Sequence, residues 1–134
     1  MGELKMSQTP PSQSQKSEAY HRFRLQVYNI VRTIPAGKVM TYGGIAALIP
    51  SPEGYDPLAY SRIRARWVGY ALKSCPEDVP WWRVVNAEGC VSLRPGHGPH
   101  IQPVMLEEEG LQMEGGKIVR LSQVIWNPKS GKTD

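Results

Sequence analysis

The chain has 134 residues, which is enough for one small domain with a modest hydrophobic core. Its 16 Lys and Arg residues against 12 Asp and Glu residues give a formal net charge of +4, a mild excess that is compatible with a polyanionic partner without identifying one. No stretch approaches the roughly 20 apolar residues of a membrane span, the N-terminus shows no signal-peptide pattern, and two cysteines cannot define a disulfide scaffold. We therefore expect an intracellular protein with reduced thiols and no membrane partner, located in the cytoplasm or, in a eukaryote, in the nucleus.

The N-terminal third is expected to consist of a tail and a helix. Residues 1–17 are polar and predict a disordered tail. A helix is expected over residues 18–33, with Ser17 as its N-cap. Its apolar residues recur at helical spacing and define one core-facing side: Tyr20, Phe23, Val27, Ile30, Val31 and Ile34. A Pro-Ala-Gly turn ends this helix, and residues 38–40 are expected to extend as a short strand.

Two further helices are expected in the middle of the chain. Thr41 can cap a short helix that runs to Leu48. A loop rich in Pro separates it from a longer helix that begins at Leu58 or Tyr60 and ends at Ser74. We expect one side of the longer helix to face the core: Ile63, Trp67, Tyr70 and Ala71.

The C-terminal third is expected to contain a small β-hairpin and a fourth helix. The hairpin joins residues 83–85 to residues 90–93 through a four-residue turn. The helix follows over residues 101–109 and ends at Gly110. Two short strands and a flexible tail complete the chain: residues 117–121, 124–126 and 127–134. Helices followed by a hairpin indicate a mainly α fold, and we expect a winged helix-turn-helix-like domain over residues 18–126. No internal repeat is visible.

Four segments, in order along the chain, resemble those of one known family. Residues 34–46 resemble its Ile-Pro-x-Gly-x-Val-x-Thr-Tyr-Gly-x-Ile-Ala segment, and residues 65–72 resemble its Ala-Arg-x-Val-Gly-x-Ala segment. Residues 79–86, Val-Pro-Trp-Trp-Arg-Val-Val-Asn, resemble its Pro-Cys-His-Arg-Val segment, and residues 106–110 resemble the run that supplies a Glu to its hydrogen-bond network. The family is that of the O6-alkylguanine-DNA alkyltransferases, and the resemblance implies the winged-helix fold of their C-terminal DNA-binding domain.

Trp81 and Trp82 stand where this family carries its reactive Cys and the His that helps to activate it. A thiolate can attack carbon and an indole cannot, so the resemblance implies a protein that is not an enzyme, similar to the alkyltransferase-like proteins. Glu109 keeps the network position without a His partner and is expected to be structural. The residues alone leave another interpretation open, in which both tryptophans are core or rim residues. Because neighbours in an extended segment point to opposite sides, we expect only one of them to face a pocket.

The resemblance implies that the short helix begins at the DNA. Tyr42 would pack against the phosphate 3′ to the target nucleotide and help to rotate the base out of the duplex. Thr41, Gly43 and Gly44 would lie at the helix N-terminus, where backbone amides suit a phosphate. Without the resemblance, Tyr42 reads as a core aromatic residue at a helix start.

The longer helix would enter the minor groove. There Arg66 resembles the family's arginine finger, which fills the space that the flipped base leaves. Ala65 and Gly69 would keep the helix narrow enough for a groove about 6 Å wide. Arg62, four residues before Arg66, could approach phosphates together with it. The alternative for each arginine is an ordinary solvated charge.

The implied lesion pocket contains Tyr42, Trp81, Trp82, Val84 and Arg94. The indole of Trp81 would pack against the flipped base and its alkyl group, and stacking of this kind contributes ~1–3 kcal/mol. Trp82 is either a wall of this pocket or a packing residue. Arg94 would stack on the modified base or donate hydrogen bonds to it, or it is a plain loop charge. Val84 would contribute its carbonyl, which accepts from the guanine amino group.

We therefore predict a monomeric, non-enzymatic DNA damage sensor without a cofactor. Its partners would be duplex DNA that contains O6-alkylguanine and the nucleotide excision repair proteins to which it flags the lesion. Two alternatives stay open: an alkyltransferase that uses Cys75 or Cys90 as a displaced acceptor, and a general winged-helix DNA-binding module without lesion preference. No metal site is expected, because His97 and His100 lie in a Gly- and Pro-rich loop without further ligands at metal-binding spacing.

Overall fold

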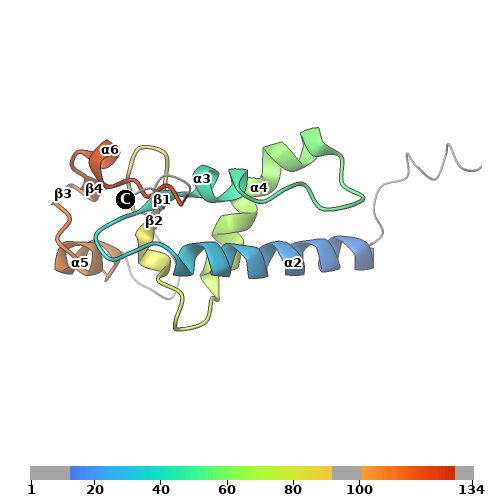
Figure 1. Cartoon of the computed structure of the whole chain (residues 1–134), viewed down its shortest axis with the longest axis horizontal. Coiled ribbons are helices and arrows are strands. Elements are labelled where there is room, and N and C mark those ends of the chain that lie inside the picture. The colour runs from blue at the N-terminus through green and yellow to red at the C-terminus, as the bar shows by residue number, and fades with distance from the viewer. Residues whose placement is uncertain (1–12, 92–100, 129–134) are drawn as a thin grey trace, which may run out of the picture.

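The computed structural model describes residues 13–91 and 101–128, and three helices form most of its N-terminal half: α2 (Gln13–Arg32), α3 (Tyr42–Ala47) and α4 (Pro57–Lys73). α4 packs against both α2 and α3, and Figure 1 shows it descending behind α2. The main core lies between these helices and includes Phe23, Val27, Val31, Ile45, Val68 and Leu72. The expectation of a mainly helical fold with small sheets is confirmed.

α2 begins earlier than its sequence predicts. It starts at Gln13 rather than at Glu18, so the predicted N-cap at Ser17 is wrong and the end of the predicted tail belongs to the helix. Gln and Lys are good helix formers, and a helix that packing has already nucleated gains one hydrogen bond for each residue it adds. Residues 1–12 and 129–134 lie outside the described part of the chain, so the rest of both predicted tails stays a prediction.

The starts of α3 and α4 follow from local capping chemistry. The side chain of Thr41 accepts a hydrogen bond from the amide of Gly44 at 2.9 Å, as expected for an N-cap. Asp56 caps α4 in the same way by accepting from the amide of Ala59 at 3.0 Å, and Pro57 occupies the first turn, where its missing N–H costs nothing. α4 therefore begins one residue before the earlier of its two predicted starts.

The first small sheet is parallel and joins distant parts of the chain. β1 (Met40–Thr41) pairs with β2 (Val84–Val85), in the register that sets Met40 opposite Val84. This pairing was not predicted, since residues 83–85 were expected to pair with residues 90–93. Within the described residues Cys90 forms a bridge with Lys117, and residues 92–93 lie outside the described part of the chain, so the predicted hairpin stays a prediction. This sheet holds the segment after α2 against the segment that contains the two tryptophans.

The hairpin of the described chain lies nearer the C-terminus. β3 (Met113–Glu114) pairs with β4 (Lys117–Ile118) in antiparallel register. Gly115 and Gly116 form the two-residue turn between them, both with positive φ, which glycine adopts without steric cost. A short strand was predicted over residues 117–121, and β4 lies at its start. The partner strand β3 was not predicted.

Three short helices complete the fold. A 3-10 helix (Trp81–Arg83) precedes β2, and α5 (Ile101–Glu108) follows the residues that are not described. α6 (Leu121–Val124) overlaps the predicted strands 117–121 and 124–126 only at their ends, and Ile125 of the second forms a parallel bridge with Val39. The chain turns after α5 at Gly110, whose φ of 99° supports the predicted helix end. Figure 1 shows α5, α6, β3 and β4 gathered at one end of the molecule, beyond the C-terminal end of α2.

Trp67 fixes the position of α4 through ring contacts. Four aromatic rings from α2, α4 and the preceding loop meet it edge to face, with centroid distances of 5.6, 5.3, 5.4 and 6.1 Å: Tyr20, Phe23, Tyr55 and Tyr60. Tyr70 was expected to share this buried side and does not, since it is 47% exposed. Three residues after Trp67 the helix has turned by about 300°, which carries Tyr70 to the edge of the packed side.

Candidate nucleic-acid interface

α4 presents a continuous basic face. Its buried residues lie on the opposite side: Tyr60, Val68, Ala71 and Leu72. Arg62, Arg66 and Lys73 are all exposed, and their spacing places them on one side of the helix. α4 contains no Asp or Glu, and within residues 13–91 and 101–128 no carboxylate forms an ion pair with Arg62 or Arg66. This face therefore carries a positive potential that suits a polyanion.

Two small residues flank Arg66 on this face. Ala65 is exposed and Gly69 is partly exposed. A Cβ placed on Gly69 meets no atom within 4 Å, so the internal packing of the protein does not require glycine at this position. Glycine inside a helix destabilises it by about 1 kcal/mol relative to alanine. The missing side chain leaves space for a surface outside the protein to approach α4.

The N-terminus of α3 contains the other predicted phosphate contacts. Thr41 uses its hydroxyl oxygen to accept from the Gly44 amide, so this amide serves the helix cap in the structure. Gly43 is exposed, and a Cβ placed there meets no atom within 4 Å. Tyr42 is partly buried and packs against the main core. The start of α3 is therefore held in place by its cap and by the ring of Tyr42.

Trp81 and Trp82 lie on the 3-10 helix and not in the extended segment that was predicted. The tight turn brings their rings into edge-to-face contact, with centroids 6.0 Å apart and planes at 86°. The expectation that they point to opposite sides is therefore wrong. Trp81 is only 9% exposed and belongs to the main core, whereas Trp82 is partly buried and packs against both hydrophobic clusters of the domain.

The Glu109 carboxylate joins three segments of the chain. It accepts hydrogen bonds from Trp82 Nε1 at 2.8 Å, from Arg83 Nη2 at 2.6 Å and from the amide of Gly37 at 3.2 Å. Arg83 also donates from Nη1 to the carbonyl of Ile34 at 2.7 Å. Burial by itself raises the pKa of Glu109, but the hydrogen bonds from Arg83 and Trp82 outweigh it and hold this pKa below its usual value. The charged carboxylate therefore ties the turn after α2 and the 3-10 helix to the chain that directly follows α5.

Gln102 of α5 is the one buried polar residue among the described residues, with 2% exposure. Its side-chain amide donates to the carbonyl of Val84 at 2.9 Å and to that of Trp82 at 3.0 Å. A carbonyl oxygen has two lone pairs, so the Val84 oxygen keeps one for a further donor. Gln102 thereby fixes the backbone whose carbonyl was predicted to face guanine.

The predicted lesion pocket is described only in part. Tyr42, Trp81, Trp82 and Val84 belong to or pack against the main hydrophobic cluster, and their grouping into one pocket stays a prediction. Arg94 lies outside the described residues, and its predicted role stays a prediction.

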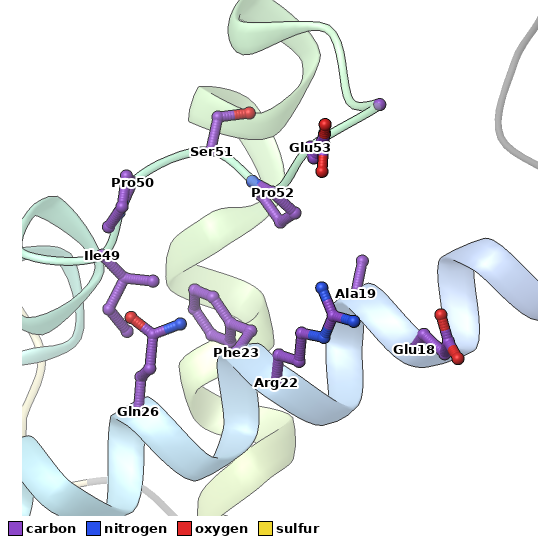
Figure 2. Close-up of a pocket in the computed structure, with 11 residues that line it drawn as sticks. Glu18, Ala19, Arg22, Phe23, Gln26, Ile49, Pro50, Ser51, Pro52 and Glu53 are labelled. Atoms are coloured by element: carbon purple, nitrogen blue, oxygen red, sulfur yellow. The ribbon is translucent and has the colours of Figure 1, made fainter.

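A cleft of about 550 Å³ lies elsewhere in the molecule. Figure 2 shows it between α2 and the loop that precedes α4, with residues 18–26 on one side and residues 49–54 on the other. Phe23 and Ile49, both buried, contribute apolar surface to it. None of the residues predicted to contact DNA or the lesion lines this cleft, so it is not the predicted lesion pocket.

Within the described residues, no three His, Cys, Asp or Glu side chains gather into a group that could hold a metal ion. His97 and His100 lie outside that part of the chain. No helix in the same part has the length and apolar character needed to cross a bilayer.

A family model, that of the 6-O-methylguanine DNA methyltransferase DNA-binding domain, matches residues 22–111. The chain belongs to this family. The DNA base-flipping protein of Vibrio parahaemolyticus is 40% identical over 110 residues, which cover 80% of this chain and 98% of that protein. The DNA base-flipping protein of Escherichia coli is 38% identical over 119 residues, with coverage of 86% and 82%.

The alkyltransferase-like members of the family are similar to the chain in sequence and in structure. Alkyltransferase-like protein 1 of Schizosaccharomyces pombe is 38% identical over 113 residues, which cover 79% of this chain and 95% of that protein. The crystal structure of S. pombe Atl1 in complex with damaged DNA containing O6-carboxymethylguanine matches with a TM-score of 0.62 at 34% identity, over 81% of this chain and 97% of that one. The resemblance to alkyltransferase-like proteins and the fold that it implied are confirmed.

Two residues that organise this alkyltransferase-family domain were not predicted. Arg83 belongs to the Pro-Cys-His-Arg-Val-like segment, so its position in the motif was a signal that could have been used. Gln102 gave only a weak signal, as a polar residue in an otherwise apolar helix turn. Its role depends on carbonyls eighteen and twenty residues away, which local patterns do not reveal.

Proposed function

We propose that this protein recognises damaged duplex DNA without repairing it chemically. In this proposal α4 binds the minor groove, Arg66 takes the place of a flipped O6-alkylguanine, and the base enters a pocket that contains Trp81 and Arg94. The observation that carries the proposal is the nature of the acceptor position. A buried indole, Trp81, stands where the alkyltransferases carry a nucleophilic thiol.

The contact between Trp82 and Glu109 supports the non-enzymatic part of the proposal. Trp82 takes the place of the family's His and donates to Glu109, so it preserves a hydrogen bond of the network. An indole N–H is a donor only and cannot accept a proton from a neighbouring group. Trp82 therefore cannot pass a proton from a nucleophile to Glu109. In this proposal the hydrogen bonds of Glu109 only stabilise the fold.

Named relatives support the recognition of damaged DNA. Two are called DNA base-flipping proteins, and a structural neighbour is bound to DNA that contains O6-carboxymethylguanine. The exposed, carboxylate-free face of α4 has the charge that a DNA backbone requires.

A sensor that cannot remove the alkyl group must pass the lesion to other proteins. We assign this step to nucleotide excision repair proteins, because they remove a damaged nucleotide without reversing its chemistry. The protein would act as a monomer where the DNA is, in the cytoplasm of a prokaryote or the nucleus of a eukaryote. A mobility shift of the protein–DNA complex upon addition of excision repair proteins tests this step.

Competitive binding to two duplexes tests recognition. The duplexes are identical except for one O6-methylguanine or guanine, and the intact mass of the protein is recorded afterwards. Tighter binding to the lesion with unchanged mass is the expected result. A mass gain of one methyl group would contradict the proposal and indicate transfer to Cys75 or Cys90, which serine variants of the two residues would distinguish. Equal affinity for both duplexes would favour a general DNA-binding module.

Gly69→Ala is expected to move stability and DNA affinity in opposite directions. The variant should raise the free energy of unfolding by roughly 0.5–1 kcal/mol, because alanine favours the helix and no internal atom obstructs its Cβ. It should weaken DNA binding several-fold, because the added methyl group lies beside Arg66 on the face that approaches the groove. Chemical denaturation and binding titrations measure the two effects.

Ser61→Ala is the matched control for this variant. Ser61 is exposed on α4, and its distance of five residues from Arg66 places it on another side of the helix. It should stabilise the helix modestly and leave affinity unchanged. If Gly69→Ala leaves DNA affinity unchanged as well, the face that carries Gly69 does not enter the groove.

A further inference from the structure

Tyr70 is an aromatic residue that the core of the domain does not bury. It is 47% exposed, although other aromatic residues of α4 and its neighbours pack around Trp67. It follows Arg66 by four residues, which places the two side chains next to each other along one side of the helix. The basic face of α4 therefore carries an exposed ring one turn beyond the residue proposed to replace the flipped base.

The ring of Tyr70 is held by a cation. The ammonium of Lys73 lies 5.4 Å from the ring centroid, within the range of a cation–π interaction. Lys73 is itself exposed and lies on the same side of α4 as Arg66. The pair thus presents an aromatic face and a positive charge together. In nucleic-acid complexes, bases or sugars pack against such a ring and phosphates pair with such a charge.

The spacing along α4 matches that of a duplex. Four residues of helix advance by about 6 Å, close to two base-pair steps of about 3.4 Å each. Proteins that bind the minor groove commonly place apolar side chains against or between its base steps and bend the DNA in this way. A ring at this distance from Arg66 would meet the groove beside the position from which the base has been extruded.

We propose that Tyr70 is a second DNA-contacting residue of α4, whose ring packs against the sugars and base edges next to the vacated position while Lys73 pairs with a phosphate at the edge of the groove. The inference rests on the proposed function, since it requires α4 to lie in the minor groove. It adds to that function a contact that holds the duplex open beside the flipped nucleotide and does not touch the lesion.

Variants of the full chain test this contact on the O6-methylguanine and guanine duplexes. Tyr70→Ala should weaken binding to both duplexes roughly tenfold or more, the effect of losing one aromatic stacking surface. Tyr70→Phe should retain most of the affinity, because the ring remains. Lys73→Gln should lower the slope of log K against log salt concentration by about 0.9, as expected for the loss of one phosphate contact.

Val104→Ala is the matched control. Val104 lies on α5 and is 48% exposed, so the variant removes apolar surface of similar exposure from a different helix. It should leave the affinity for both duplexes unchanged. The folded fraction of every variant is measured by circular dichroism on the same samples, so that a loss of affinity can be compared with a loss of folded protein.

Two results would overturn the inference while leaving the proposed function intact. One is wild-type affinity of Tyr70→Ala for both duplexes, with the lesion preference preserved. The other is a loss of affinity that the unfolded fraction accounts for entirely, which would make Tyr70 a residue that only covers the edge between α2 and α4. If the wild-type protein instead binds both duplexes equally, the proposed function fails, and the Tyr70 contact is still decided by the variants on the guanine duplex.

Discussion

Arg66→Ala is expected to weaken binding to the O6-methylguanine duplex by roughly 10- to 100-fold. Extruding a base from the stack costs a few kcal/mol, and a side chain that occupies the vacated space recovers part of that cost. A loss of ~1.4–2.8 kcal/mol corresponds to this range of affinity. The fold should be unaffected, because Arg66 is exposed and alanine is a good helix former.

The role of Arg66 in flipping is separable from its charge. Arg66→Lys keeps the charge and loses the planar guanidinium. Its binding should therefore depend on salt as that of the wild type does, while its affinity should stay as low as that of Arg66→Ala. A 2-aminopurine placed next to the target nucleotide reports extrusion, since its fluorescence rises when its stacking neighbour leaves the duplex. Arg22→Ala removes an exposed charge from α2 and is the matched control. Wild-type affinity and fluorescence of Arg66→Ala would show that another residue fills the space.

The helices that carry the candidate interface could be predicted because their signals are local. Thr41 has a side chain that caps a helix, and Pro57 in the next helix can occupy only a first turn or a loop. The start of α2 was missed for the same reason. The polar residues before Glu18 carry no apolar period, and their helical state depends on extension from the packed part of the helix.

The sheets could not be predicted from local patterns. β1 and β2 are forty-four residues apart, and neither has more than two residues in the sheet. Residues 83–85 were assigned to a hairpin because a turn-like segment follows them, which is the nearest available partner in sequence. The structure pairs Val84 with Met40, a residue forty-four positions away, and this pairing positions the two tryptophans.

Arg66 and Trp81 were assigned by the motifs that contain them, and their roles at DNA stay predictions. The contacts of Trp82 were misjudged, because the motif has changed at that position. Trp82 was treated as the loss of a partner for Glu109, because no indole occupies that position in the alkyltransferases. The structure shows that the indole N–H reaches the carboxylate at 2.8 Å. The indole N–H is thus a donor to Glu109, a contact that depends on the folded geometry and that the sequence alone did not reveal.

Glu109→Ala should produce the largest loss of stability. The variant removes the acceptor of hydrogen bonds from three residues, Gly37, Trp82 and Arg83, and leaves the Arg83 guanidinium, which is 17% exposed, without its counter-ion. Removing one partner of a buried ion pair costs about 3–5 kcal/mol, and the partial exposure here favours about 3 kcal/mol. We expect a decrease of the melting temperature on the order of 10 °C, measured by circular dichroism. Glu108→Ala, a change at the exposed residue that ends α5 and directly precedes Glu109, should change the melting temperature little.

The dependence of this effect on pH identifies its origin. The folded pKa of Glu109 lies below its ordinary value of 4.5, so the carboxylate stabilises the fold fully above that value. The contribution is lost as the pH falls through the folded pKa, where the wild-type Glu109 becomes protonated. The difference in unfolding free energy between wild type and Glu109→Gln should therefore be constant from pH 6 to 7 and shrink as the pH falls below about 4.5. A difference that stays the same down to pH 3 would mean that the cost of Glu109→Gln comes from the shape of the glutamine side chain and not from its missing charge. Arg83 and Trp82 would then not hold Glu109 as an anion.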